Sequence, residues 1–168
     1  MDIRIEKAAP GDAAILLEYL RQVGGETDNL TYGLEGMPFS VKAEAEFISN
    51  MENSGDDIML LAKNGDKIVG CASLNRLPRR MKHRGDLAIS VAKDYWNKGI
   101  GSKLLDNIIV FSRENDFHII DLQVRSDNKS AIHLYEKYGF KKIGEHPAFF
   151  RISGENISFD IMCLELNE

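Results

Sequence analysis

A glycine-rich turn joins a predicted strand to a predicted amphipathic helix over residues 91–102, Val-Ala-Lys-Asp-Tyr-Trp-Asn-Lys-Gly-Ile-Gly-Ser. Helix N-termini present unpaired backbone N–H groups and the positive end of the helix dipole, and Gly99 and Gly101 carry no Cβ that would keep a ligand from this backbone. The junction is therefore typical of a site for a pyrophosphate-like group. It has neither the Gly-Lys-Ser/Thr ending of a P-loop nor the Gly-x-Gly-x-x-Gly pattern of a dinucleotide-binding turn.

A second segment, residues 122–144, reads Leu-Gln-Val-Arg-Ser-Asp-Asn-Lys-Ser-Ala-Ile-His-Leu-Tyr-Glu-Lys-Tyr-Gly-Phe-Lys-Lys-Ile-Gly. It predicts a strand, a polar turn, a short helix that ends at Gly139, and another strand. Together, the two segments closely resemble the GNAT superfamily of acyl-CoA-dependent N-acyltransferases. Residues 96–101 match the family's loop, Gln/Arg-x-x-Gly-x-Gly/Ala, at both glycines, whereas Trp96 replaces the usual Gln or Arg. The resemblance is specific over residues 86–144 and looser elsewhere.

The resemblance implies an α/β (mixed α+β) fold with a central, mostly antiparallel, twisted sheet of about seven strands. It also implies helices on both faces and two strands splayed apart at the acyl-CoA site. At 168 residues and 43% hydrophobic content, the chain is expected to form a single domain over residues 1–168. Apolar and β-branched runs predict strands at 3–8, 58–62, 68–74, 87–91, 119–124 and 158–166.

Helical periodicity appears after Pro10, after Ser40, after Gly99 and over residues 131–138. We expect Gly24 and Gly25 to end the first helix. Ser40 is a predicted N-cap, and the helix that it opens carries three apolar residues on one side: Ala43, Phe47 and Met51.

The resemblance also implies the reaction, which is transfer of an acetyl group from acetyl-CoA to a primary amine by direct attack in a ternary complex. A lysine-like amine has a pKa of about 10.4, so freeing its lone pair at pH 7 costs roughly 4.6 kcal/mol and calls for a base or a water chain that ends at one. Asp86 is the first candidate because family members often place a carboxylate before the strand that leads to the loop. It could instead be an ion-paired edge residue next to Arg84. Glu26 is the competing carboxylate, as a base or as a binder of the substrate cation.

Tyr135 matches the tyrosine that, in many family members, hydrogen-bonds the departing sulfur and returns a proton to it. A phenol with a pKa near 10 stays protonated and able to donate. The alternative is a core aromatic, because Leu134 and Tyr138 share its predicted face. Asn128 matches a polar residue that contacts the pantetheine arm, and it is equally suited to be the N-cap of the short helix.

The cofactor-binding residues follow from the same resemblance. Proteins of this family bind pantetheine through the backbone of the strand that here contains Ile89, Ser90 and Val91. Lys98 and Lys137 either neutralise the phosphates of the cofactor or are solvated, and the same two alternatives apply to both. Asn97 replaces a frequent glycine, which is tolerable because Asn adopts left-handed conformations readily. The predicted phosphate-loop set is Asn97, Lys98, Gly99, Ile100, Gly101 and Ser102.

Charge bears on the partners. Residues 26–57 carry eight acidic side chains against Lys42 alone, which indicates a cationic acceptor or else a solvated acidic surface. A basic run over 76–84 lacks interleaved aromatics, and with a net charge of −5 we expect no nucleic-acid partner. Homodimers are common in proteins of this family, so the resemblance implies self-association.

The histidines and the two cysteines, Cys71 and Cys163, lack metal-ligand spacing, so no metal is expected. The N-terminus has no basic segment followed by an apolar run, and no apolar stretch reaches membrane-spanning length, so we expect a soluble cytoplasmic protein without a membrane partner. The alternative to an enzyme is a non-catalytic acyl-CoA-binding or sensing module.

Overall fold

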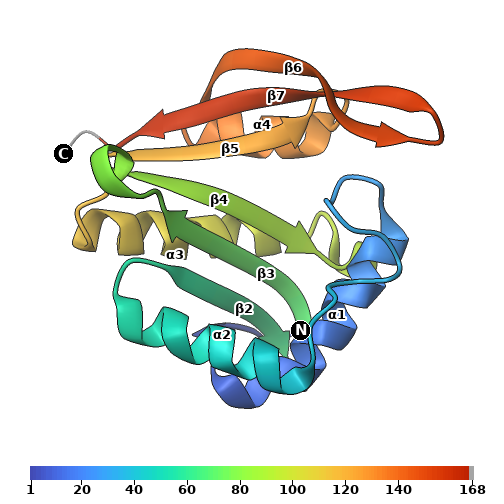
Figure 1. Ribbon diagram of the computed structural model, residues 1–168, viewed down its shortest axis with the longest axis vertical. Coiled ribbons are helices and arrows are strands. Elements are labelled where there is room, and N and C mark those ends of the chain that lie inside the picture. Colours follow the sequence, from blue (N-terminus) through green and yellow to red (C-terminus); the bar gives the residue numbers. More distant parts are fainter. Residues whose placement is uncertain (167–168) are drawn as a thin grey trace.

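The structure, a computed structural model, describes residues 1–166 and contains one seven-stranded sheet in the order β1-β2-β3-β4-β5-β7-β6 (Figure 1). Neighbouring strands are antiparallel except for β4 and β5, which are parallel, so the predicted mostly antiparallel sheet is confirmed. The strands are β1 (Ile3–Lys7), β2 (Ile58–Asn64), β3 (Lys67–Arg76), β4 (Arg84–Val91), β5 (Ile119–Arg125), β6 (Lys141–Ile152) and β7 (Glu155–Glu165).

Helices cover both faces of this sheet, as expected (Figure 1). Successive side chains of a strand point to opposite faces, so the β2 neighbours Leu60 and Leu61 pack in different cores. The helices are α1 (Ala13–Glu26), α2 (Val41–Ser54), α3 (Ile100–Glu114) and α4 (Lys129–Lys137). One core contains Leu61 with Leu16 of α1 and Ile48 of α2, and the other contains Leu60 with Leu104 of α3 and Tyr135 of α4. Within residues 1–166, none of the helices combines the length and apolar character that a membrane span requires.

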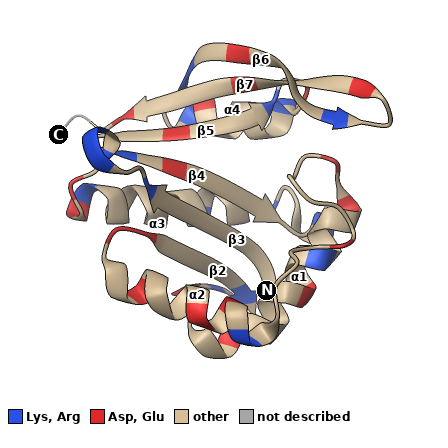
Figure 2. Ribbon diagram, in the orientation of Figure 1, with Lys and Arg blue, Asp and Glu red and all other residues tan. Residues whose placement is uncertain are grey.

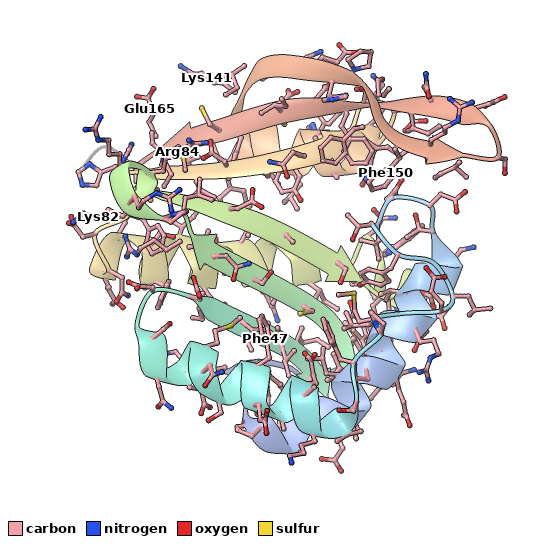
Figure 3. The ribbon with its side chains drawn as sticks, in the orientation of Figure 1. Phe47, Lys82, Arg84, Lys141, Phe150 and Glu165 are labelled. Atoms are coloured by element: carbon pink, nitrogen blue, oxygen red, sulfur yellow. The ribbon has the colours of Figure 1, made fainter. Side chains whose placement is uncertain are left out.

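The second helix begins where the sequence predicted, but it buries a different side from the predicted one. Ser40 accepts a hydrogen bond from the backbone N–H of Ala43 at 3.1 Å, as an N-cap does. Phe47, however, is 51% exposed (Figure 3), whereas Glu44, Ile48 and Met51 are buried. These three positions follow i, i+4, i+7 spacing, so the sheet-facing stripe passes through Ile48 and turns Phe47 outward.

Gly24 and Gly25 do not end the first helix, because α1 continues to Glu26. The structure gives a different reason for glycine at position 24: a Cβ there would lie 2.1 Å from the carbonyl oxygen of Gly33. The connection between α1 and α2 therefore crosses α1 closely at this point.

The parallel pair β4–β5 is short. It pairs Arg84 with Ile119, Gly85 with Ile120 and Asp86 with Asp121, and beyond these residues the strands diverge (Figure 1). The splay implied by the family resemblance is therefore present, and we call the point after Asp86 the fork.

The backbone of β4 is open on its β5 side beyond the fork. Ala92 donates its N–H to the carbonyl of Val69 on the β3 side at 2.9 Å. Polar groups alternate between the two sides of a strand, so those of Ile89 and Val91 face away from β3 and toward the diverging β5.

Replacing Gly24 with alanine is expected to destabilise the protein by about 1–3 kcal/mol, because the added methyl group meets a backbone carbonyl rather than a flexible side chain. The direction of the change in stability is informative, because Gly→Ala inside a helix otherwise stabilises a protein by roughly 0.5–1 kcal/mol. Urea unfolding measures the change. Gly11→Ala is the matched control, because a Cβ at Gly11 meets nothing within 4 Å. Equal stability of the two variants would contradict the close crossing.

Candidate active site

A cleft of about 690 Å³ lies where β4 and β5 diverge, between the end of β4 and the N-terminal ends of α3 and α4. It brings together most of the residues predicted to bind the cofactor. These are Ile89, Ser90 and Val91 of β4, Asn97, Gly99, Ile100, Gly101 and Ser102 of the loop and α3, Asn128 before α4, and Tyr135 within α4.

The N-terminus of α3 is left uncapped. Gly99 is its N-cap residue, has φ of 78° and provides no side chain to the first turn, and Asn97 also has a positive φ, 61°. The first helical hydrogen bond is donated by Lys103 to the carbonyl of Gly99 at 3.1 Å. The backbone N–H groups of residues 100–102 therefore have no partner within the helix, and all three residues line the cleft. This is the donor set that a phosphate requires.

Gly101 has a second role that the sequence did not indicate. A Cβ at this position would lie 3.1 Å from Cδ2 of Leu134, so glycine lets α4 approach the first turn of α3. The N-terminal end of α3 and the C-terminal half of α4 are thereby close together.

Trp96, which replaces the family's usual Gln or Arg, lines the cleft but directs its polar atom at the protein. Its indole Nε1 donates to the carbonyl of Val91 at 2.8 Å. The indole therefore occupies the carbonyl of Val91 on the open side of β4. The N–H of Val91 and the N–H and carbonyl of Ile89 remain on that side for a ligand.

Lys98 is not brought to the cleft. It is not among the residues that line the cleft, and its Nζ donates to the carbonyl of Asp94 at 2.9 Å and lies 5.2 Å from the centre of the Tyr95 ring. The predicted cofactor contact of Lys98 is therefore not supported. Lys137, which the sequence placed on an equal footing, does line the cleft.

Tyr135 is both a core aromatic and a cleft residue. It is 8% exposed, packs against Phe140 with ring centroids 5.5 Å apart, and lines the cleft. Burial raises the pKa of its phenol to about 12, so the hydroxyl is a proton donor at neutral pH. Asn128 is confirmed as the N-cap of α4, because its Oδ1 accepts from Ala131 N–H at 3.3 Å, and the residue also lines the cleft, where the predicted contact with pantetheine would be made.

The backbone polar groups of Ser90 face β3, so the predicted backbone contact with the cofactor falls to Ile89 and Val91, and Ser90 contributes its side chain. Its Oγ lies 2.9 Å from the hydroxyl of Tyr19, which ties the end of β4 to α1. Tyr19 is buried, and burial raises its pKa. The sequence analysis missed Tyr19, although Leu16, Tyr19 and Val23 follow i, i+3, i+7 spacing on the buried side of α1.

Asp86 lies inside β4 rather than before it, because the strand begins at Arg84. It is at the fork, outside the residues that line the cleft, and it points to the same face of β4 as Ser90. Gln123 of β5 donates Nε2–H to its Oδ1 at 3.2 Å. Burial raises the pKa of Asp86, the nearby charge of Asp121 raises it further, and the bond from Gln123 acts in the opposite direction.

Glu26 is not brought to the cleft either. Its Oε1 accepts from Gln22 Nε2 at 2.8 Å, and its Oε2 accepts from the backbone N–H of Lys93 at 2.8 Å. Oε1 is therefore bound within α1, whereas Oε2 connects the end of α1 to the turn before the phosphate loop. This placement assigns Glu26 a structural contact in place of the predicted catalytic or substrate-binding one.

Other acidic residues of the 26–57 run are similarly occupied. Asp56 pairs with Arg76 at 3.1 Å, Asp57 accepts from the backbone N–H of Arg76 at 2.7 Å, and Glu35 accepts from the backbone N–H of Gly33 at 2.9 Å. Glu44 is 4% exposed. Glu35 and Asp56 are nevertheless exposed, so the run fits the solvated acidic surface as well as a surface for a cationic acceptor.

The cleft also includes residues that sequence reasoning did not select. Residues of the connection after α1 were not selected, because nothing in its composition distinguishes one position from another. The added residues are Val23 of α1, Thr27, Asn29 and Leu30 of the connection after α1, Tyr95 and Trp96 before the loop, and Ser130, Ala131 and Leu134 of α4.

The forked parallel strand pair beside the uncapped N-terminus of α3 is the arrangement implied by the resemblance to acyl-CoA-dependent acyltransferases. The family model described as "Acetyltransferase (GNAT) family" matches residues 27–140, and the chain belongs to this family. An acetyltransferase of the GNAT family from Streptococcus pneumoniae is 32% identical, and its crystal structure superimposes with a TM-score of 0.95 over 98% of this chain and 100% of that one.

Two further similarities are informative. The N-alpha-acetyltransferase RimI of Mycobacterium tuberculosis is 34% identical over 94 residues, which are 55% of this chain and 58% of that protein. The match therefore spans little more than half the length of this relative. The fold is also shared with yncA of Salmonella typhimurium, solved with its cofactor acetyl-CoA, at 20% identity and a TM-score of 0.86 over 99% of this chain and 95% of that one.

The chain contains a single tryptophan, and Trp96 lies in the cleft. Acetyl-CoA is therefore expected to change the intrinsic tryptophan emission in a saturable way, because a ligand in the cleft alters the surroundings of the indole. A fluorescence titration gives the dissociation constant, and Trp96→Phe removes the signal as a control. Unchanged emission at ligand concentrations where calorimetry reports binding would place acetyl-CoA elsewhere.

Proposed function

We propose that this protein is an acetyl-CoA-dependent N-acetyltransferase that transfers the acetyl group to a primary amine by direct attack in a ternary complex. One observation carries the proposal: a single cleft contains the open backbone of β4, the uncapped N-terminus of α3 and the buried phenol of Tyr135. Family membership supports the same activity.

Each part of the cleft matches one part of acetyl-CoA. The pyrophosphate binds the N–H groups of residues 100–102, with Lys137 adding positive charge. The pantetheine amides bind the free N–H of Val91 and the polar groups of Ile89, as an added strand would. This arrangement positions the thioester near the fork, between Tyr135 and the face that carries Asp86.

The chemistry needs two proton transfers. The neutral amine attacks the thioester carbonyl, the N–C bond forms, and the C–S bond breaks. Asp86 takes up the proton that the amine releases, relayed by water because Asp86 lies outside the cleft. Tyr135 donates its proton to the departing thiolate and regains one from solvent. Since Asp86 must be ionised, activity is lost as pH falls through its raised pKa.

The acceptor is a primary amine. The N-alpha amine of a peptide is the first to test, since a relative that is 34% identical is named an N-alpha-acetyltransferase. Polyamines and aminoglycosides form the second group, as the cationic acceptors that the acidic run first indicated.

Thiol release from acetyl-CoA across peptides, amino acids, polyamines and aminoglycosides tests the proposal. With an active acceptor, Tyr135→Phe is expected to lower kcat by about 100-fold without changing the affinity for acetyl-CoA, because it removes only the proton donor. Tyr138→Phe is the matched control: its hydroxyl, on the residue that follows α4, lies outside the cleft and bonds Asp106 at 2.7 Å.

Full kcat in Tyr135→Phe would refute the role of the phenol. Tight binding of acetyl-CoA without thiol release to any acceptor, including peptide N-termini, would refute the enzyme and favour a sensing module.

A further inference from the structure

Two aspartates lie side by side at the fork. Asp86 of β4 and Asp121 of β5 are register partners in the last pair before the strands diverge, and they are the red segments of these two strands in Figure 2. Like charges on directly neighbouring strand positions repel, so each carboxylate disfavours ionisation of the other. The two carboxylates are therefore electrostatically coupled at the point where the sheet opens.

The surroundings of the two carboxylates differ. Asp121 is 5% exposed, and its Oδ2 accepts from Nε of Arg84 at 2.7 Å, so its charge is paired at short range (Figure 3 labels Arg84). Among the residues that the structure describes, no cation lies within ion-pair distance of the Asp86 oxygens, and Oδ1 instead accepts from the amide of Gln123 at 3.2 Å. Two like groups whose environments differ in this way are suited to separate roles.

Gln123 is placed to reach across the fork. It lies two residues beyond Asp121, after the last β4–β5 pair, and its side chain is on the same face of β5 as that of Asp121. The backbone ladder no longer fixes the distance between the strands there. The Gln123–Asp86 hydrogen bond is thus the contact that orients the carboxylate at the opening of the splay.

We propose that Gln123 and the Asp121–Arg84 ion pair position and tune the Asp86 carboxylate as the acceptor of the amine proton. Gln123 is a positioning residue, since it acts through Asp86. The inference rests on the proposed function for the identity of the base, and it adds the residues that make this aspartate a base.

The charged and titratable groups around Asp86 determine the direction in which each substitution shifts its pKa. Burial and the charge of Asp121 raise its pKa, whereas the hydrogen bond from Gln123 and the charge of Arg84 lower it. Across the sheet, Asp121 is also the register partner of Cys163 on β7, and the β3 partner of Asp86 is the neutral Asn75. Removing the Gln123 bond must raise the pKa of Asp86, and removing the Asp121 charge must lower it.

The test is the pH dependence of kcat/KM in four variants. Gln123→Leu is expected to move the acidic limb of the kcat/KM profile, where activity falls as Asp86 is protonated, to higher pH by roughly one unit. The reason is that the ionised carboxylate loses its hydrogen-bond donor. Gln123→Lys and Asp121→Asn are expected to move it down by a similar amount, because one adds a cation and the other removes an anion. Asn107→Leu, which removes an exposed amide on α3, is the control and leaves the limb in place.

An NMR titration of the Asp86 carboxyl carbon in the same variants gives a readout that needs no catalysis. Substitutions at the exposed Gln123 test both signs even where Asp121→Asn does not fold, and the tryptophan emission with acetyl-CoA confirms an intact cleft. Opposite shifts of both the carboxyl titration and the kinetic limb support the inference.

Shifts in one common direction, no shift, or a carboxyl titration that moves while the kinetic limb stays in place would each overturn the inference. A wild-type protein that acetylates no acceptor would overturn the proposed function instead. The tuning of Asp86 would then be judged by the carboxyl titration alone.

Discussion

The end of the β4–β5 ladder after Asp86 is the constraint on which the rest of the site depends. Parallel pairing stops there, and Ile89 and Val91 keep backbone groups on the side that β5 has left. A buried backbone donor or acceptor without a partner costs about 1–3 kcal/mol. A ligand whose amides bond to this edge removes that cost, and the free energy recovered contributes to its binding. The fork thus provides a binding edge inside the sheet, and the helices around it supply charge and protons.

The parts of the site that the sequence predicted are those formed by short-range structure. The strand, turn and helix around Gly99 are contiguous, so the positive φ at Asn97 and the uncapped first turn of α3 follow from local rules. The same holds for Asn128, which caps α4 and reaches the cleft. Tyr135 was placed by its match to the family and by the helical spacing around it.

The parts that could not be predicted depend on which distant segments meet. Glu26 is held by Lys93, 67 residues away, and Asp86 is contacted by Gln123, 37 residues away. Nothing near either carboxylate in the sequence distinguishes the one that a backbone N–H captures from the one at the fork. Phe47 illustrates the same limit on a helix, where a rotation by one position exchanged the buried and exposed residues.

The central claim is that acetyl-CoA completes the open edge of β4. Residue-specific amide hydrogen exchange, followed by NMR with and without acetyl-CoA, tests it most directly. The amide of Val91, and that of Ile89, should exchange quickly in the free protein and become protected when acetyl-CoA binds, whereas those of Ala88 and Ser90, which face β3, should be protected in both states. Unchanged exchange at Ile89 and Val91 in the saturated complex would contradict the account.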